Sequence, residues 1–183
     1  PLSRRFLGAD NARMAKLANP LRNVRIGNMR FEGGANSGNT RAIAGVFNVD
    51  CEVFDVQCSH FSGAAIYFDT GFNNKLMGTI EVYECGNQQE SDVHWYRQGE
   101  PYWENVRSYK ANAFGPQLAF GNGGYVNSVV SQSAQNGRGF KVYCHAGLTV
   151  GHVRANNTAP QMTGISILED SDPTDTGDVT VLY

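Results

Sequence analysis

The chain has 183 residues, of which 17 are acidic and 15 are basic, so its net charge is only −2. This balance gives no electrostatic reason to expect nucleic acid or an anionic membrane as a partner, and no segment approaches the ~18 consecutive apolar residues of a membrane span. The 21 glycines and the hydrophobic content of 41% are typical of a strand-and-turn protein and argue against disorder or a coiled coil.

The first 20 residues are predicted to form an arm followed by a short helix. Residues 10–19 read DNARMAKLAN, with Asp10 or Asn11 as the N-cap, Met14 and Leu17 on one face, and Pro20 as a stop. We divide the chain into an arm and capping helix over residues 1–20 and a single β domain over residues 21–183.

The β domain is organised around the stretch from Asp50 to Phe68. Its apolar positions form two short alternating runs, and Asp55 lies between them where the alternation slips by one residue. This pattern predicts two strands that meet at a tight corner, and the alternation that begins after Gly63 predicts a third strand. A single turn of three strands cannot bury its inner side chains alone, so the unit should recur.

The unit recurs about every 25 residues. Apolar residues aligned with Val56 form a column, and a polar residue precedes each of them, as a corner requires. The column is Met29, Val56, Ile80, Val106, Val129, Val153 and Val179. Further inward columns include Val53, Met77 and Trp103 in one strand and Val93, Trp95, Leu118 and Phe120 in the third strand.

Seven such corners with three short strands per step resemble the right-handed, single-stranded parallel β-helix of pectate-lyase-like proteins and phage tailspikes. The fold predicted from this resemblance is all-β, with about seven turns and the short N-terminal helix as a cap. Regularly spaced short strands with glycine-rich turns also describe a twisted β-sandwich or a jelly roll, which is the alternative.

The four cysteines are predicted to be reduced. Cys51, Cys58 and Cys144 fall on inward positions, and Cys85 lies just past an inward strand. Because they are distributed over different strands and turns, a disulfide framework is not expected, and buried thiols act as small apolar side chains. Reduced cysteines fit folding in a cytoplasm.

Polar and aromatic residues on the outward positions of the third strand are predicted to share one surface. With neighbouring strands ~4.8 Å apart, the small residues Ala119 and Gly121 should leave a dip between the rows of His94 and Lys141. Such a surface suits a polysaccharide, because aromatic rings stack on sugars while charged groups hold hydroxyls or uronates. The candidate catalytic residues are His94, Tyr96, Asp92 and Lys141, and the candidate substrate-binding residues are Tyr67, Asp69, Arg97, Gln117 and Tyr143.

A proton-transfer role for His94 or Tyr96, with Lys141 or Arg97 neutralising a uronate, is what β-elimination needs. The Asp92-x-His94 pair followed by Tyr96 is loosely similar to the sites of β-helical alginate lyases and epimerases. Hydrolysis would need two carboxyl groups at roughly 5 to 9.5 Å, and Asp69 and Asp92 are expected farther apart. A partner carboxyl could come from a loop glutamate whose position the sequence does not specify, namely Glu84, Glu90, Glu100 or Glu104. No cofactor is expected, and no metal either, because the four histidines share no close ligand spacing.

We therefore predict a glycan-binding segment of a tailspike-like protein that recognises a bacterial surface polysaccharide. A catalytic form of this hypothesis adds cleavage of the polysaccharide by hydrolysis or elimination. The resemblance implies a homotrimer on a virion tail that acts outside the cell after cytoplasmic folding. The alternatives are a secreted polysaccharide lyase or uronan epimerase and a structural β-helix that serves as a shaft. Nucleic acid binding and membrane insertion are not expected.

Overall fold

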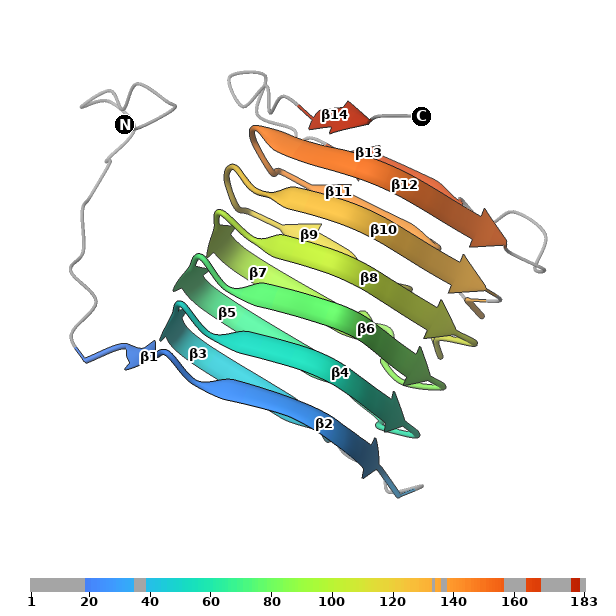
Figure 1. The fold of residues 1–183 in the computed structure, drawn as a ribbon. Helices are drawn as coiled ribbons and strands as arrows, with labels where there is room; N and C mark the ends of the chain where they lie inside the picture. Colours follow the sequence, from blue (N-terminus) through green and yellow to red (C-terminus); the bar gives the residue numbers. More distant parts are fainter. Residues whose placement is uncertain are drawn as a thin grey trace.

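The computed structural model describes residues 19–34, 39–132, 134–135, 138–156, 164–168 and 179–181. They form a parallel β-solenoid of about six turns (Figure 1). Two seven-stranded sheets build it, and every strand pair within them is parallel. Neighbouring strands in a sheet are next-but-one in the sequence, so each turn adds one strand to each sheet. The predicted all-β parallel solenoid is confirmed, and the sandwich and jelly-roll alternatives are excluded.

The two sheets, called A and B here, are stacked in chain order along one axis (Figure 1). Sheet A contains β1 (Leu21–Arg22), β3 (Ile43–Val49), β5 (Ile66–Phe72), β7 (Val93–Gly99), β9 (Gln117–Ala119), β11 (Phe140–Tyr143) and β13 (Ile165–Leu168). Sheet B contains β2 (Arg25–Glu32), β4 (Glu52–Ser59), β6 (Lys75–Tyr83), β8 (Tyr102–Tyr109), β10 (Tyr125–Gln132), β12 (Leu148–Asn156) and β14 (Val179–Val181).

The apolar column predicted from the repeat is present in sheet B. Met29, Val56, Ile80, Val106, Val129 and Val153 pair in that order, each with the next. The last member of the predicted column is wrong, because Val179 pairs with Leu148 instead of Val153. The stacking of like residues therefore holds from β2 to β12.

Each turn contains two strands, whereas the sequence predicted three. The runs on either side of Asp55 belong to one strand, β4, which bends at this residue without ending. Asp55 has a φ of 48°, and Asn28 in the preceding turn has a φ of 54°. Short polar side chains tolerate this left-handed backbone, so the sequence signal for a corner was correct although the strand continues through it.

Sheet A bends as well, at a column of positive-φ residues that the sequence did not reveal. The column consists of Phe47, Thr70, Arg97, Phe120 and Cys144. Its side chains lie at the turning point of the sheet, so Phe120 and Cys144 do not occupy the inward positions predicted for them. Phe120 is 37% exposed and Cys144 is half-buried.

A bulge in β6 shifts the inward position by one residue. Leu76, and not the predicted Met77, pairs with Val53 and Trp103, and Leu76 is fully buried. The pairing shifts between Leu76 and Thr79, where Gly78 has a φ of 63°. A slip of one residue moves a side chain to the other face of a sheet, and Met77 therefore faces outward.

The predicted register of β9 is wrong by two residues. Trp95 pairs with Leu118, and Leu118 pairs with Val142. On the outer face, His94 therefore lies beside Gln117, and Tyr96 lies beside Ala119. A shift of two residues preserves which side chains point inward, so hydrophobic alternation alone cannot detect it.

The interior is filled by large apolar side chains and by a short polar column at one corner. Trp95 and Trp103, predicted to be core residues, are fully buried and meet edge to face at 5.5 Å. Gln98 and His145 are buried in the polar column, with Gly121 between them in the stack. A Cβ at Gly121 would overlap the carbonyl oxygen of Gln98 and lie 2.6 Å from His145 Nε2, so only glycine leaves room for the imidazole.

All four cysteines are reduced, as predicted, and Cys51, Cys58 and Cys85 are buried. Burial raises the pKa of both Cys58 and Cys85 to about 12, which keeps these thiols protonated. Residues 10–18 of the expected capping helix lie outside the described residues. Within the described ranges there is no helix long and apolar enough to cross a membrane.

Candidate functional site

The outer face of sheet A brings together the predicted site residues other than Asp92. Pairing between strands places Tyr67, His94, Gln117 and Lys141 in one outward column, each beside the next. A second outward column contains Asp69, Tyr96, Ala119 and Tyr143. Since successive side chains alternate between faces, both columns point away from the core that contains Trp95.

Asp92 lies inside the solenoid, so its predicted outward position is wrong. Its carboxylate accepts a hydrogen bond from the Ser108 hydroxyl of β8 and another from the N–H of Val93, and the residue is fully buried. Burial raises the pKa of Asp92 to about 7, against the lowering effect of these hydrogen bonds. A carboxyl group in this position joins the two sheets and cannot reach a glycan on the surface.

His94 lies in the centre of the outward surface but is itself 8% exposed. Its ring lies 5.5 Å from that of Tyr67 and 6.1 Å from that of Tyr96, and its buried Nδ1 has no hydrogen-bond partner among the described residues. Burial lowers the pKa of His94, with the cations Lys141 and Arg41 acting in the same direction. The imidazole is therefore neutral at pH 7 and could accept a proton.

The small residue expected between His94 and Lys141 is not there, because Gln117 lies between them in the column. The Gln117 side chain accepts a hydrogen bond from Ser91 Oγ at 3.1 Å, which holds it against the sheet. The small residue Ala119 instead lies between Tyr96 and Tyr143, and the next residue, Phe120, contacts both tyrosine rings.

Phe120 is the centre of a continuous strip of aromatic rings with a cation at each end. Its ring centroid lies 4.9 Å from that of Tyr96 and 4.8 Å from that of Tyr143. The Arg97 guanidinium lies 4.6 Å from the centroid of Tyr96, and the Lys141 ammonium lies 4.7 Å from that of Tyr143. We call these five residues the cation–aromatic strip: Arg97, Tyr96, Phe120, Tyr143 and Lys141.

The two cations of the strip remain available for an anionic ligand. Neither Arg97 nor Lys141 forms an ion pair with a described acidic side chain. Partial burial lowers the pKa of Lys141, and the neighbouring charge of Arg138 adds to this effect. A half-buried cation without a carboxylate partner gains more from an incoming anion than a fully solvated one does.

A third cation on this face is already neutralised. Arg41 lies 3.8 Å above the centre of the Tyr67 ring and forms an ion pair with Glu90, to whose Oε2 its Nε also donates at 3.0 Å. Glu90 further accepts hydrogen bonds from Asn39 at 2.8 Å and from the N–H of Ala64 at 3.1 Å. This brace ties the loop before β7 to the margin of sheet A and fixes the position of Tyr67.

Sequence reasoning missed Phe120 and Arg41 as surface residues, and it could not place the loop residue Glu90. Phe120 was placed inside because the alternation of β9 was extended to it, whereas its positive φ of 54° turns the chain just after Ala119. The contact between Arg41 and Glu90 joins residues 49 positions apart. No local pattern could have revealed that contact. Within the described part of the chain, no group of three or more His, Cys, Asp or Glu side chains is placed to hold a metal ion.

No protein-family model matches the chain, and neither a curated protein nor a solved structure does. Function is therefore inferred from the geometry of the solenoid and its outer faces.

Proposed function

We propose that the chain is a glycan-binding β-solenoid that holds an acidic polysaccharide on the outer face of sheet A. The single observation that carries this proposal is the cation–aromatic strip. The partly exposed ring of Phe120 offers an apolar surface for the C–H face of a sugar. Arg97 and Lys141, at the two ends of the strip, can each meet a carboxylate, so the arrangement fits a polymer that carries repeated negative charges.

The test is binding to purified acidic polysaccharides, with polygalacturonate, alginate and polysialic acid as probes. Replacing Arg97 or Lys141 with alanine should each weaken binding of the preferred polymer about 10-fold, because each removes one charge-assisted contact. Arg154→Ala is the matched control, since it removes an exposed cation from sheet B. Equal loss in the control, or unchanged binding in both sheet A variants, would refute the proposal.

A second candidate function is cleavage of the bound polymer by β-elimination. The observation that favours it is His94, a neutral and largely buried imidazole on the same face as Lys141. His94 would take the C5 proton of the uronate while Lys141 or Arg97 neutralises its carboxylate. The C4–O glycosidic bond would break as the C4=C5 double bond forms, and water would protonate the leaving oxygen. New absorbance from unsaturated sugar ends that disappears in His94→Gln would support it. Hydrolysis is less favoured, because Asp92 is in the core and Glu90 is held in an ion pair.

As a setting for this binding we propose a tailspike-like protein that recognises a bacterial surface polysaccharide. It would be a homotrimer on a virion tail and act outside the cell after cytoplasmic folding. Four reduced cysteines support a protein that folds in a reducing compartment. Sedimentation with and without oligosaccharide tests this setting. A trimer that binds glycan supports it, whereas a monomer that cleaves glycan indicates the secreted lyase or epimerase. A chain that binds no glycan indicates the structural shaft.

A further inference from the structure

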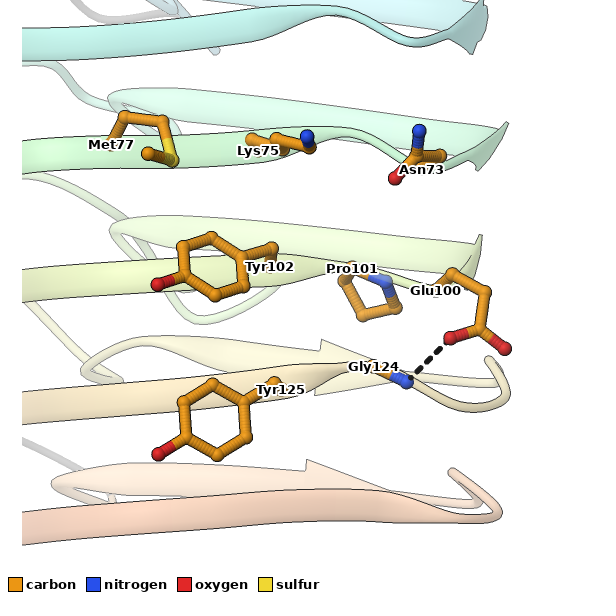
Figure 2. Close-up of a pocket in the computed structure, with 8 residues that line it drawn as sticks. All are labelled: Asn73, Lys75, Met77, Glu100, Pro101, Tyr102, Gly124 and Tyr125. Atoms are coloured by element: carbon orange, nitrogen blue, oxygen red, sulfur yellow. Dashed lines mark hydrogen bonds between the residues drawn. The ribbon is translucent and has the colours of Figure 1, made fainter.

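A groove crosses the outer face of sheet B over β6, β8 and β10, on the face opposite to the one predicted to bind glycan (Figure 2). Its volume is about 480 Å³. It is lined by Asn73, Lys75, Met77, Glu100, Pro101, Tyr102, Gly124 and Tyr125. This groove was not predicted from the sequence, because Met77 was expected to point inward.

The floor of the groove is a pair of tyrosines one turn apart. Tyr102 of β8 and Tyr125 of β10 are directly paired, their ring centroids lie 6.0 Å apart, and the angle between the rings is 24°. Figure 2 shows both rings turned toward the viewer, with their hydroxyl groups on the same side. Among the described cations, none lies over either ring, whereas three cover tyrosines of sheet A. The pair is therefore a flat aromatic platform.

Polar groups of both charges surround this platform. The carboxylate of Glu100 is held by the N–H of Gly124 at 3.2 Å, which Figure 2 marks with a dashed line. Lys75 lies in register with Tyr102 on the adjacent strand, and no described acidic side chain forms an ion pair with it. One cation and one anion leave the groove without net charge, so it favours an uncharged ligand with many hydroxyl groups.

We propose that this groove is a second binding site, which takes a neutral oligosaccharide. Two successive pyranose units place their apolar C–H faces on Tyr102 and Tyr125, so the sugar chain runs along the solenoid axis. Their hydroxyl groups donate to Glu100 and accept from Lys75, a combination of apolar floor and few polar groups that is usual in ligand sites.

Other ligands fit this groove less well. A nucleic acid needs several cations for its phosphates, and the groove supplies Lys75 beside the carboxylate of Glu100. A peptide added as an extra strand needs a free strand edge, and β8 is paired on both sides, with β6 and with β10. The site is separate from the cation–aromatic strip, so this inference does not depend on acidic polysaccharide binding.

The experiment screens the whole chain against an array of neutral oligosaccharides of glucose, galactose, mannose, xylose and N-acetylglucosamine, followed by calorimetric titration of the best ligand. Tyr102→Ala and Tyr125→Ala should each weaken its binding about 10-fold or more, since each removes one stacking surface. Tyr102→Phe keeps the ring and should stay within about threefold of the wild type.

Tyr109→Ala is the matched control. Tyr109 lies on the same strand as Tyr102 and stacks on Tyr83 at 4.6 Å, but it lies outside the groove. Its removal should leave sugar binding unchanged, and so should Arg97→Ala on sheet A. If an alanine variant does not fold, Glu100→Gln, which keeps the shape of the rim, should still lower affinity severalfold. The proposal is overturned if no neutral oligosaccharide binds, or if the groove variants bind as tightly as the control.

Discussion

Sheets A and B expose tyrosines in different ways, although they belong to the same solenoid turns. On sheet A, the rings of Tyr67, Tyr96 and Tyr143 each lie beneath a cation. On sheet B, Tyr102 and Tyr125 lie side by side with no described cation over them. The comparison shows that the repeat sets the spacing of outward side chains, while the neighbours of each ring decide whether a cation covers it.

The loops that support the two faces differ as well. The connection between β6 and β7 is long and carries Glu90, which clamps Arg41 at the margin of sheet A. The connection between β7 and β8 is short, and it places Glu100 and Pro101 directly at the groove of sheet B. The long loop therefore braces one face, whereas the short turn leaves the other face open.

The largest expected effect concerns Asp92, the buried carboxyl group that links the loop before sheet A to Ser108 of sheet B. Its folded-state pKa of about 7 exceeds the ordinary value, so the folded chain retains a proton that the unfolded chain releases. The free energy of unfolding should fall as pH rises from about 4 to about 7, by an amount on the order of 4 kcal/mol. Asp92→Asn should remove this fall, as measured by urea denaturation at both ends of that range.

The control for this prediction is Asp69→Asn, which alters a carboxyl group on the outer face of sheet A and should retain the pH dependence. If the free energy of unfolding of Asp92→Asn falls by the same amount over this pH range, another group is responsible. The Asp92 carboxyl group would then not titrate between about pH 4 and about pH 7.

Next in size is the contrast between an ion pair that braces sheet A and one that lies on sheet B. Glu90→Gln leaves Arg41 partly buried without its partner and should lower the free energy of unfolding by about 3 kcal/mol. Glu52→Gln, which breaks the exposed pair with Arg25 on sheet B, should cost less than about 1 kcal/mol. The free energy of unfolding of both variants is measured by chemical denaturation. Similar losses in the two variants would show that the ion pair on sheet A stabilises the fold no more than the one on sheet B.

The ion pair between Arg41 and Glu90 should lose its stabilising effect in acid. Burial alone would raise the pKa of Glu90, but its hydrogen bonds with Arg41, Ala64 and Asn39 lower it to about 2. Its stabilising contribution is therefore present above the unfolded pKa and should be lost as pH falls from about 4.5 toward about 2. Thermal melts across this range should show a steeper loss of stability for the wild type than for Glu90→Gln.

A pair of ligand-binding variants tests the faces against each other. Phe120→Ala should weaken acidic polysaccharide binding about 10-fold and leave neutral oligosaccharide binding unchanged, because its ring lies between the two cations of sheet A. Tyr125→Ala should have the opposite pattern. Titrating both variants with both ligands measures this directly, and a variant that loses both ligands equally would indicate a single shared site.

The smallest expected effect is the response to salt. Raising sodium chloride from about 0.05 M to about 0.5 M should weaken acidic polysaccharide binding severalfold, because screening shortens the range of the attraction to Arg97 and Lys141. Neutral oligosaccharide binding should change by less than about twofold. Equal salt dependence for the two ligands would mean that charge does not distinguish the faces.

The sequence predicted the fold and most of the candidate surface. The column from Met29 to Val153, the inward tryptophans and the shared outward positions of Tyr67, His94 and Lys141 all followed from residue type and spacing. These features depend on the alternation of side chains along a strand, which is visible in the sequence whatever the rest of the chain does.

The errors came from places where alternation gives no information about the neighbouring strand. The β9 register is one example, since Leu118 and Phe120 point to the same side in any alternating strand, and only the length of the preceding loop decides which pairs with Trp95. The bulge beside Gly78 is another, because one extra residue turned Met77 outward and opened the groove of sheet B. Asp92 precedes β7, so no strand pattern specified the direction of its side chain.

Residue order alone determined that this chain coils into stacked turns with an apolar interior, because a period of about 25 residues that buries like side chains has few other solutions. The tertiary structure decided which outward residues become neighbours across turns: Phe120 with Tyr96 and Tyr143, Arg41 with Glu90, and Tyr102 with Tyr125. The physical reason is that contacts between turns depend on loop lengths and bulges, which shift one strand along another without changing the pattern of either strand.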